Sequence, residues 1–95
     1  MYIEYSKEYL RSLKRISKRR ILSESAINAT LESFKKNPYD NRLNFKKINC
    51  KRDKNRHSIR VLNTQYRILL SVIDDFAVLI CICDHDDYDL RNKSC

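Results

Sequence analysis

Two arginines, a histidine and a tyrosine in the second half of the chain are the side chains best suited to chemistry on a phosphate. They are Arg60, Arg67, His85 and Tyr88. Cutting RNA without a metal requires a base for the 2′-OH proton, cations that stabilise charge on the phosphate, and an acid for the leaving 5′ oxygen. Guanidinium groups match phosphate oxygens with paired hydrogen bonds, and histidine titrates near neutral pH. These residue types therefore predict a phosphate site with proton-transfer groups beside it.

Further cations precede these four residues along the chain. Most lie in a predicted edge strand and in the charged connection that follows it. A histidine stands at the beginning of the next predicted strand. We expect this set to hold RNA phosphates without reading sequence. Its members are Lys46, Lys47, Lys51, Arg52, Lys54 and His57.

Each candidate catalytic residue also has a structural interpretation. The two arginines can pair with acids such as Asp84 or Asp86. The histidine can be a surface residue, and the tyrosine can pack the last turn against the sheet. Two interpretations also apply to His57, a structural role and an RNA contact. The residues alone leave these alternatives open.

The two arginines lie in a run of three predicted strands between His57 and Cys83. Short β-rich segments alternate there with two-residue polar breaks at Asn63-Thr64 and Asp74-Asp75. This pattern is typical of an antiparallel meander. Alternation places each arginine on the face opposite the apolar residues of its own strand. If those apolar residues share one core, both arginines emerge on the other face of the sheet.

The remaining elements must support this meander. Apolar spacing predicts a short strand at residues 1–5, helices at 7–18 and from about 20 to 36, an edge strand at 45–50 and a charged tail after residue 83. Helices that precede a meander indicate an α+β fold. We expect a single domain over residues 1–95, with an N-terminal helical hairpin packed on one face of a four- or five-stranded, mainly antiparallel sheet.

The charge of +8 is unevenly distributed along the chain. Residues 1–70 hold 18 Lys and Arg against 6 Asp and Glu, whereas residues 71–95 hold 2 against 6. A strongly basic body favours a polyanionic partner, nucleic acid before membrane. The alternative is a merely well-hydrated surface, and charge alone does not decide between the two.

Several classes of site are excluded or disfavoured. The chain contains no glycine, which excludes glycine-rich phosphate loops and leaves Asn and Asp to make the tight turns. No apolar run approaches the roughly 20 residues of a membrane span, and the N-terminus lacks signal-peptide features, so we expect a cytoplasmic location. Cys81 and Cys83 point to one face of a predicted strand, but this spacing alone is a weak metal signal. We interpret them as small, reduced, apolar strand residues.

The run from Ser58 to Tyr88, SIRVLNTQYRILLSVIDDFAVLICICDHDDY, resembles the core of the RelE/ParE toxin superfamily. In that superfamily a pair of strands with the pattern S-I-R-V and Y-R-I is followed by D-D, V-L-L, H-D and Y. The helical hairpin that ends at Asn37-Pro38 is similar to the superfamily as well. The resemblance therefore covers nearly the whole chain.

The resemblance implies a RelE-like fold and the toxin of a type II toxin–antitoxin system. Most such toxins are ribosome-dependent endoribonucleases that cleave mRNA by 2′-OH attack, without metal or cofactor, and so inhibit translation. Arg60 and Arg67 would then neutralise the scissile phosphate, His85 would act as general acid or base, and Tyr88 would stack a base or assist proton transfer. The implied partners are a cognate antitoxin, in a hetero-oligomer, together with the ribosome and mRNA, and no membrane.

Two other functions stay open. A ParE-like, non-catalytic inhibitor of DNA gyrase shares the fold without the nuclease residues, and His85 and Tyr88 favour the nuclease over it. The other is a small RNA-binding protein with no antitoxin.

Overall fold

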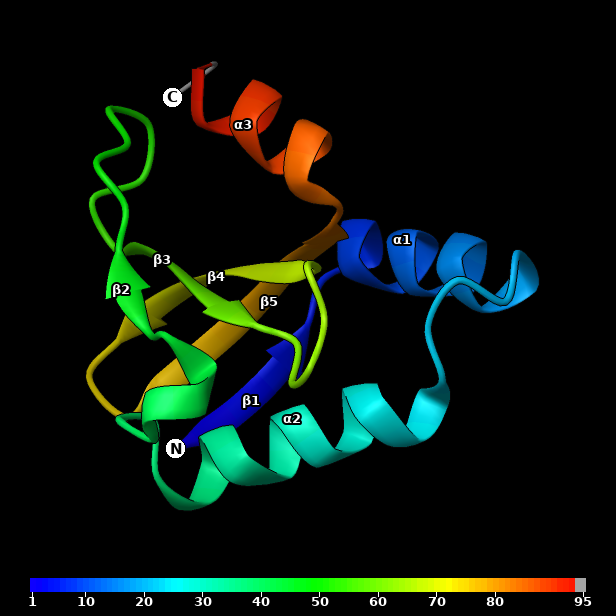
Figure 1. Ribbon diagram of the computed structural model, residues 1–95. Coiled ribbons are helices and arrows are strands. Elements are labelled where there is room, and N and C mark those ends of the chain that lie inside the picture. The colour runs from blue at the N-terminus through cyan, green and yellow to red at the C-terminus, as the bar shows by residue number, and fades with distance from the viewer. Residues whose placement is uncertain (94–95) are drawn as a thin grey trace.

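The computed structural model describes residues 1–93, apart from the side chains of His85, Asp87, Asn92 and Lys93. Five strands form one sheet in the order β1-β5-β4-β3-β2 (Figure 1). Their bounds are β1 Tyr2–Tyr5, β2 Lys46–Lys47, β3 Arg56–Arg60, β4 Arg67–Ile73 and β5 Phe76–Cys83. The α+β class is confirmed. The antiparallel prediction holds for three strand pairs, but β1 runs parallel to β5, so the sheet is mixed.

Three helices and one short turn accompany the sheet. They are α1 Lys7–Lys18, α2 Glu24–Lys36, the 3₁₀ turn η1 Asn41–Leu43 and α3 His85–Lys93. The first helix has the bounds that the sequence predicts, because the Ser6 hydroxyl caps it by accepting a hydrogen bond from the Tyr9 N–H at 3.0 Å. No helix within residues 1–93 is long and apolar enough to cross a membrane.

The connection between α1 and α2 delays the start of the second helix. Arg20 has a φ of 54°, and its N–H binds the Ser17 carbonyl while the Ile21 N–H binds the Ile16 carbonyl. This pair of bonds is a Schellman motif, which ends a helix with one left-handed residue. The Ser23 hydroxyl then caps α2. The helix therefore begins at residue 24 and not near residue 20.

Asparagine and aspartate make most of the left-handed turns. Outside Arg20, the residues of the described chain with positive φ are Asn44, Asn63 and Asp74, at 47°, 61° and 53°. Asp74 lies in the two-residue loop between β4 and β5, where Ile73 pairs with Phe76. These residues tolerate the left-handed region best after glycine.

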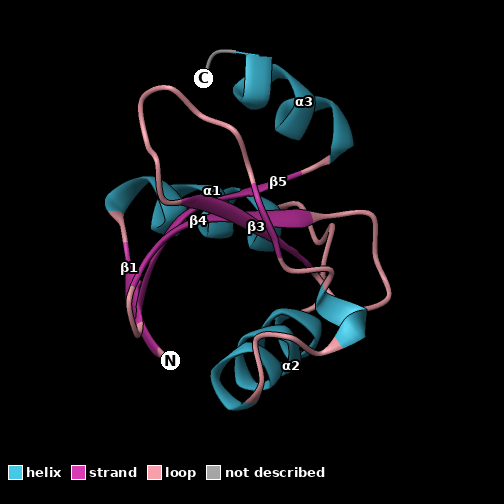
Figure 2. Ribbon diagram, turned by 90° about the vertical axis from the view of Figure 1, so that its left-hand side faces the viewer, coloured by secondary structure: helices cyan, strands magenta, loops and turns pink. Residues whose placement is uncertain are grey.

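The main core lies between one face of the sheet and the first two helices. Its buried side chains come from α1, α2, η1, the last three strands and the residue that follows β3: Tyr9, Ile16, Ile27, Leu31, Phe34, Leu43, Ile59, Val61, Ile68, Leu70, Ala77, Leu79 and Ile82. Both helices of the predicted hairpin join this core, but a pocket lies between them. Figure 2 shows α2 on the side of the sheet away from α3.

Two buried hydroxyl groups bind these helices to β5 and to the loop between β3 and β4. Ser12 Oγ accepts a hydrogen bond from the Ile82 N–H at 3.1 Å, and Thr30 Oγ1 accepts one from the Leu62 N–H at 3.0 Å. Each hydroxyl also donates to a carbonyl of its own helix. Both therefore satisfy backbone donors of the sheet region that would otherwise be buried without a partner.

The opposite face of the sheet carries a second, smaller core. Its buried members are Ile48, Leu69, Cys81, Cys83 and Tyr88. The sequence predicts a charged tail after β5 and helices on only one face of the sheet, and both predictions need correction here. The residues after β5 form α3, whose Tyr88 packs on this face. The edge strand β2 is also shorter than predicted, two residues in place of six.

Candidate active site

Arg60 and Arg67 lie directly opposite each other on neighbouring strands. The antiparallel register pairs Arg60 of β3 with Arg67 of β4. Ile59, Val61 and Ile68, their neighbours in sequence, belong to the main core. Side chains alternate along a strand and paired residues share a face, so both guanidiniums lie on the face that carries the second core.

Both arginines are half-buried and incompletely hydrogen-bonded. Arg60 Nε and Arg67 Nη1 are buried and have no hydrogen-bond partner among the described residues. Neither arginine forms an ion pair with a described carboxylate, so the acid-pairing alternative receives no support here. Like charges that face each other across two strands repel. The pair therefore concentrates positive charge on this face, and its partly exposed guanidinium groups can bind an anion such as a phosphate.

Tyr88 of α3 covers one of the two arginines. Arg67 Cζ lies 5.4 Å from the centroid of the Tyr88 ring, within the range of a cation–π interaction. The Tyr88 hydroxyl lies 3.3 Å from Ser58 Oγ, and Ser58 is fully buried on β3. Tyr88 itself is 7% exposed. Tyr88 therefore packs against the sheet, as its structural interpretation predicts. The same packing places its ring against Arg67.

His85 is the first residue of α3. Its side chain lies outside the described part of the structure, so its proposed role as proton donor or acceptor has no geometry here. Asp84 and Asp86, on either side of it, are exposed.

The candidate RNA-binding residues on the strands are divided between the two faces. Lys46 pairs with Ser58 and so lies on the arginine face, whereas Lys47 pairs with His57 on the other face. The His57 ring stacks on Phe45, with centroids 5.0 Å apart and an interplanar angle of 21°. His57 Nδ1 also lies 2.6 Å from the Asn55 carbonyl oxygen. The structure thus gives His57 local packing partners and does not bring it next to the arginines.

The remaining candidates, Lys51, Arg52 and Lys54, are exposed in the loop between β2 and β3. Asp53 fixes this loop, because its carboxylate accepts hydrogen bonds from the Asn55 N–H, Arg56 Nε and Ser71 Oγ at 2.9, 3.2 and 3.3 Å. Partial burial alone would raise the pKa of Asp53, but these hydrogen bonds outweigh burial and lower it. The three cations therefore extend from an anchored loop.

A polar hollow of about 380 Å³ adjoins Arg60. Its other lining residues come from η1 and the β3–β4 loop: Arg42, Asn63, Thr64 and Gln65. Arg42 makes two hydrogen bonds to the Asp40 carboxylate, which hold the pKa of Asp40 below its ordinary value. Sequence reasoning missed this group, because no local pattern places η1 beside the end of β3.

Several solved structures have a fold similar to that of this chain. The YafQ toxin in the Escherichia coli DinJ–YafQ toxin–antitoxin complex is 15% identical, with a TM-score of 0.74, covering 88% of this chain and 91% of that one. A copper-bound mutant toxin from Helicobacter pylori is 15% identical, with a TM-score of 0.72, covering 90% and 96%. A chain of the YoeB–YefM complex from Staphylococcus aureus is 19% identical, with a TM-score of 0.66, covering 90% and 97%. The chain has a RelE-type fold. No protein-family model and no curated protein matches it.

A second group of cations lies on α1 and on the residue that follows it. They line one shallow hollow: Arg11, Lys14, Arg15, Lys18 and Arg19. All five are exposed. A basic helical face of this kind is typical of a solvated surface.

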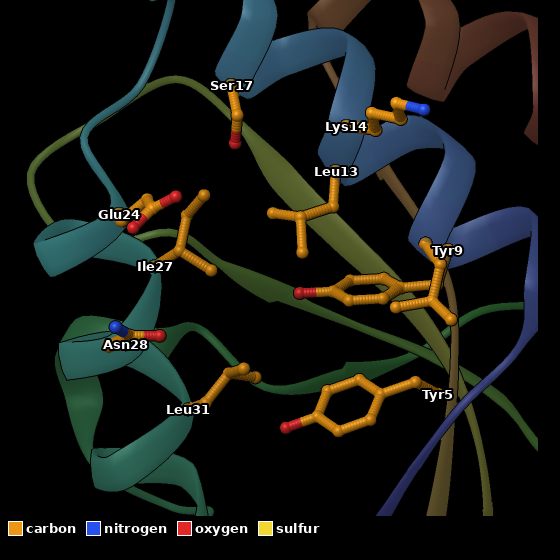
Figure 3. Close-up of a pocket in the computed structure, with 10 residues that line it drawn as sticks. Tyr5, Tyr9, Leu13, Lys14, Ser17, Glu24, Ile27, Asn28 and Leu31 are labelled. Carbon is orange, nitrogen blue, oxygen red and sulfur yellow. The ribbon is translucent and has the colours of Figure 1, made fainter.

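A third hollow, of about 410 Å³, separates α1 from α2 on the main-core side (Figure 3). Figure 3 shows Tyr5 and Tyr9 directed toward Ile27 and Leu31 of α2. Tyr9 is fully buried, and its hydroxyl has no hydrogen-bond partner among the described residues. Burial, followed by the influence of Tyr5, raises the pKa of Tyr9. This pocket is predominantly apolar and lies on the other side of the sheet from the arginines.

Proposed function

We propose that this chain is the toxin of a type II toxin–antitoxin system, and that it acts in the cytoplasm as a ribosome-dependent, metal-independent mRNA endoribonuclease that inhibits translation. The observation that carries the proposal is the Arg60–Arg67 pair, with buried N–H groups that have no partner in the described structure. The toxin fold supports the assignment, because the neighbours with that fold include YafQ and YoeB.

In the proposed reaction the 2′-OH of one nucleotide attacks the adjacent phosphorus and displaces the 5′ oxygen of the next nucleotide. Arg60 and Arg67 face the phosphate and stabilise the charge that gathers on its oxygens. His85 transfers a proton at the attacking or the leaving oxygen. The Tyr88 ring, which already lies against Arg67, stacks on a base or assists proton transfer.

Binding of the RNA backbone is assigned to cations around this centre. Lys46 shares the arginine face, and Lys51, Arg52 and Lys54 extend from the anchored β2–β3 loop. These contacts to phosphates would position the mRNA without reading its sequence. Lys47 and His57, on the other face, are proposed only as peripheral contacts. The ribosome would hold the mRNA in line, since so small a site offers few contacts of its own.

The proposed partner is a cognate antitoxin that forms a hetero-oligomer with this chain. YafQ is paired with DinJ, and YoeB with YefM, in the solved complexes. The net charge of +8 favours an acidic partner segment, because complementary charge speeds association. Co-expression of the neighbouring gene should relieve growth arrest. Persisting arrest, or the absence of any arrest, would contradict the assignment of that partner.

The test of catalysis is an mRNA cleavage assay in a translating extract, with a parallel reaction that lacks ribosomes. The parent should cut only when ribosomes are present. Arg60→Ala, Arg67→Ala and His85→Ala should each slow cleavage about 100-fold or more, the usual loss when a preorganised cation or an acid–base group is removed. Lys36→Ala, an exposed substitution at the end of α2, is the matched control and should cut as fast as the parent.

Three results would count against this proposal. If His85→Ala cuts at the parental rate, the proton-transfer role is wrong. If both arginine variants cut at the parental rate, the site is elsewhere. If the parent cleaves no RNA and instead traps DNA gyrase on DNA, the gyrase-inhibitor alternative is correct.

A further inference from the structure

Two thiols touch each other beneath α3. Cys81 and Cys83 are alternate residues of β5, and their Sγ atoms lie 2.9 Å apart. Both are cysteine thiols and are at most 1% exposed. A disulfide bond is about 2.05 Å long, so the two sulfurs need to approach by only about 1 Å to become bonded. The pair is therefore nearly aligned for a covalent bridge.

A positive charge accompanies the thiol pair. Arg91 of α3 is half-buried and bonded to the Glu8 carboxylate of α1. Burial lowers the pKa of the Arg91 guanidinium, but the Glu8 hydrogen bond and the negative potential of Cys81 and Cys83 outweigh burial and raise it. The attraction is mutual, so Arg91 also stabilises negative charge on an ionised sulfur. Ionised cysteines are the ones that react with oxidants.

We propose that Cys81 and Cys83 form a two-electron oxidation site, in which a hydroperoxide converts the two thiols into one intramolecular disulfide. One sulfur, as thiolate, attacks the O–O bond and becomes a sulfenic acid, and the peroxide leaves as an alcohol or as water. The second thiolate attacks that sulfur, forms the S–S bond and expels hydroxide, which leaves as water with the proton of the second thiol. The two sulfurs together lose two electrons, and the peroxide gains them.

Access to the site is controlled by α3. The thiols share a small core with Tyr88 and Leu69, and the Arg91–Glu8 pair fastens the other end of α3 to α1. A peroxide reaches the sulfurs only when this helix lifts from the sheet. Oxidation should therefore be slow in the folded protein and should depend on how firmly α3 is held.

The site adjoins the candidate active site without being part of it. Cys83 is the cross-strand neighbour of Arg67 on β4. The inference rests on the thiol geometry and on Arg91, not on the proposed cleavage of RNA. Its test uses no RNA, so failure of either proposal leaves the other standing.

The test exposes the folded full-length chain to hydrogen peroxide and then alkylates the remaining thiols before digestion with trypsin. No Lys or Arg lies between Arg67 and Arg91, so one peptide, residues 68–91, contains both Cys81 and Cys83 and excludes Cys50 and Cys95. Mass spectrometry should show this peptide losing the mass of two hydrogen atoms and escaping alkylation. Dithiothreitol should restore both thiols. Recovery of two alkylated thiols after prolonged exposure, or of added oxygen atoms in place of the lost hydrogens, would overturn the proposal.

Single-thiol and charge variants make the test specific. Cys81→Ser and Cys83→Ser should each abolish the loss of hydrogen from this peptide. Arg91→Gln and Glu8→Gln both break the contact that fastens α3, but only Arg91→Gln removes the positive charge beside the sulfurs. Arg91→Gln, followed in peptide 68–93, should oxidise roughly tenfold more slowly than Glu8→Gln, the size of effect that a nearby charge has on an ionising group. Equal rates for these two folded variants would show that Arg91 has no part in the site.

Discussion

Arg67 lies against the ring of Tyr88, with 5.4 Å between the guanidinium carbon and the ring centroid. No ring of the described residues covers Arg60, its cross-strand partner, which lines a polar hollow. The two arginines of the pair are thus in different surroundings. Tyr88 links α3 to Arg67 through its ring and to Ser58 through its hydroxyl, which allows the two contacts to be separated experimentally.

The hydroxyl of Tyr88 should contribute to stability only through Ser58. Tyr88→Phe keeps the ring over Arg67 and removes the 3.3 Å hydroxyl contact. We expect Tyr88→Phe and Ser58→Ala each to lower the free energy of unfolding by about 1 kcal/mol, the typical net value of one hydrogen bond. Because each change removes the same contact, the double variant should cost less than the two single changes together. Urea unfolding measures all four proteins, and strict additivity would show that the hydroxyls do not interact.

Most of the fold could be predicted because the local patterns are strong. The first helix has its predicted bounds, and β5 spans the predicted residues 76–83. The loop at Asp74-Asp75 has the predicted two residues, since Asp74 adopts the left-handed conformation that a glycine-free chain assigns to Asn or Asp. Alternation on β3 and β4 was sufficient to place both arginines on one face.

What the sequence could not supply depended on tertiary contacts. Residues 85–93 have many charges and no apolar stripe, so no periodicity marks α3; its Tyr88 is held by Ser58 and Arg67, which are remote in sequence. The parallel pairing of β1 with β5 joins the two ends of the chain and has no local signature. Arg42 beside Arg60 was missed for the same reason.

Replacing Tyr9 with phenylalanine should stabilise the protein, or leave it unchanged, at neutral pH. The Tyr9 hydroxyl is buried without a hydrogen-bond partner among the described residues, and leaving such a group unpaired costs about 1–3 kcal/mol. The pKa of Tyr9 is raised in the fold by burial. The fold therefore favours the neutral form of Tyr9 over the ionised form. The free energy of unfolding should be constant in this respect below pH about 10 and should fall as the pH rises above that value.

The alkaline part of this prediction has a matched control in Tyr39, which is 79% exposed. Thermal unfolding between pH 9 and 11, a range that begins about one unit below the ordinary tyrosine pKa, should show a smaller alkaline loss for Tyr9→Phe than for the parent. Tyr39→Phe should follow the parent. A loss of stability for Tyr9→Phe at pH 7 would indicate that its hydroxyl has a partner.

Asp53 should stabilise the β2–β3 loop at neutral pH and cease to do so in acid. Its carboxylate accepts three hydrogen bonds that lower its pKa in the fold. Stability from this group is present above its ordinary pKa of about 3.9 and is lost as the pH falls below that value. Asp53→Asn should cost about 1 kcal/mol at pH 7, through loss of charge in these bonds. Asp75→Asn, in an exposed turn, should cost little.

The pH dependence is the sharper part of the Asp53 experiment. The difference in unfolding free energy between the parent and Asp53→Asn should shrink as the pH is lowered from 7 toward 3, because the parent loses its carboxylate. A difference that stays constant over this range would mean that the charge of Asp53 has no role. The three loop cations should also bind RNA less firmly in the variant, since their loop is less fixed.

Removing one arginine of the pair should stabilise the protein while it impairs function. Arg60 and Arg67 face each other with like charge. Like charges in this position are destabilising, and we expect a cost similar in size to the gain of about 0.2–1 kcal/mol from a favourable cross-strand pair. Arg60→Gln should therefore unfold at a higher urea concentration than the parent in low salt, and this gain should diminish at high salt, where the repulsion is screened.

Inorganic phosphate should stabilise the parent and have a smaller effect on Arg60→Gln, because the variant lacks one of the two cations that bind it. Arg42→Gln is the control, because Arg42 is already paired with Asp40 and its loss relieves no repulsion. If Arg60→Gln is less stable than the parent at every salt concentration, the arginine pair contributes to folding and not primarily to anion binding.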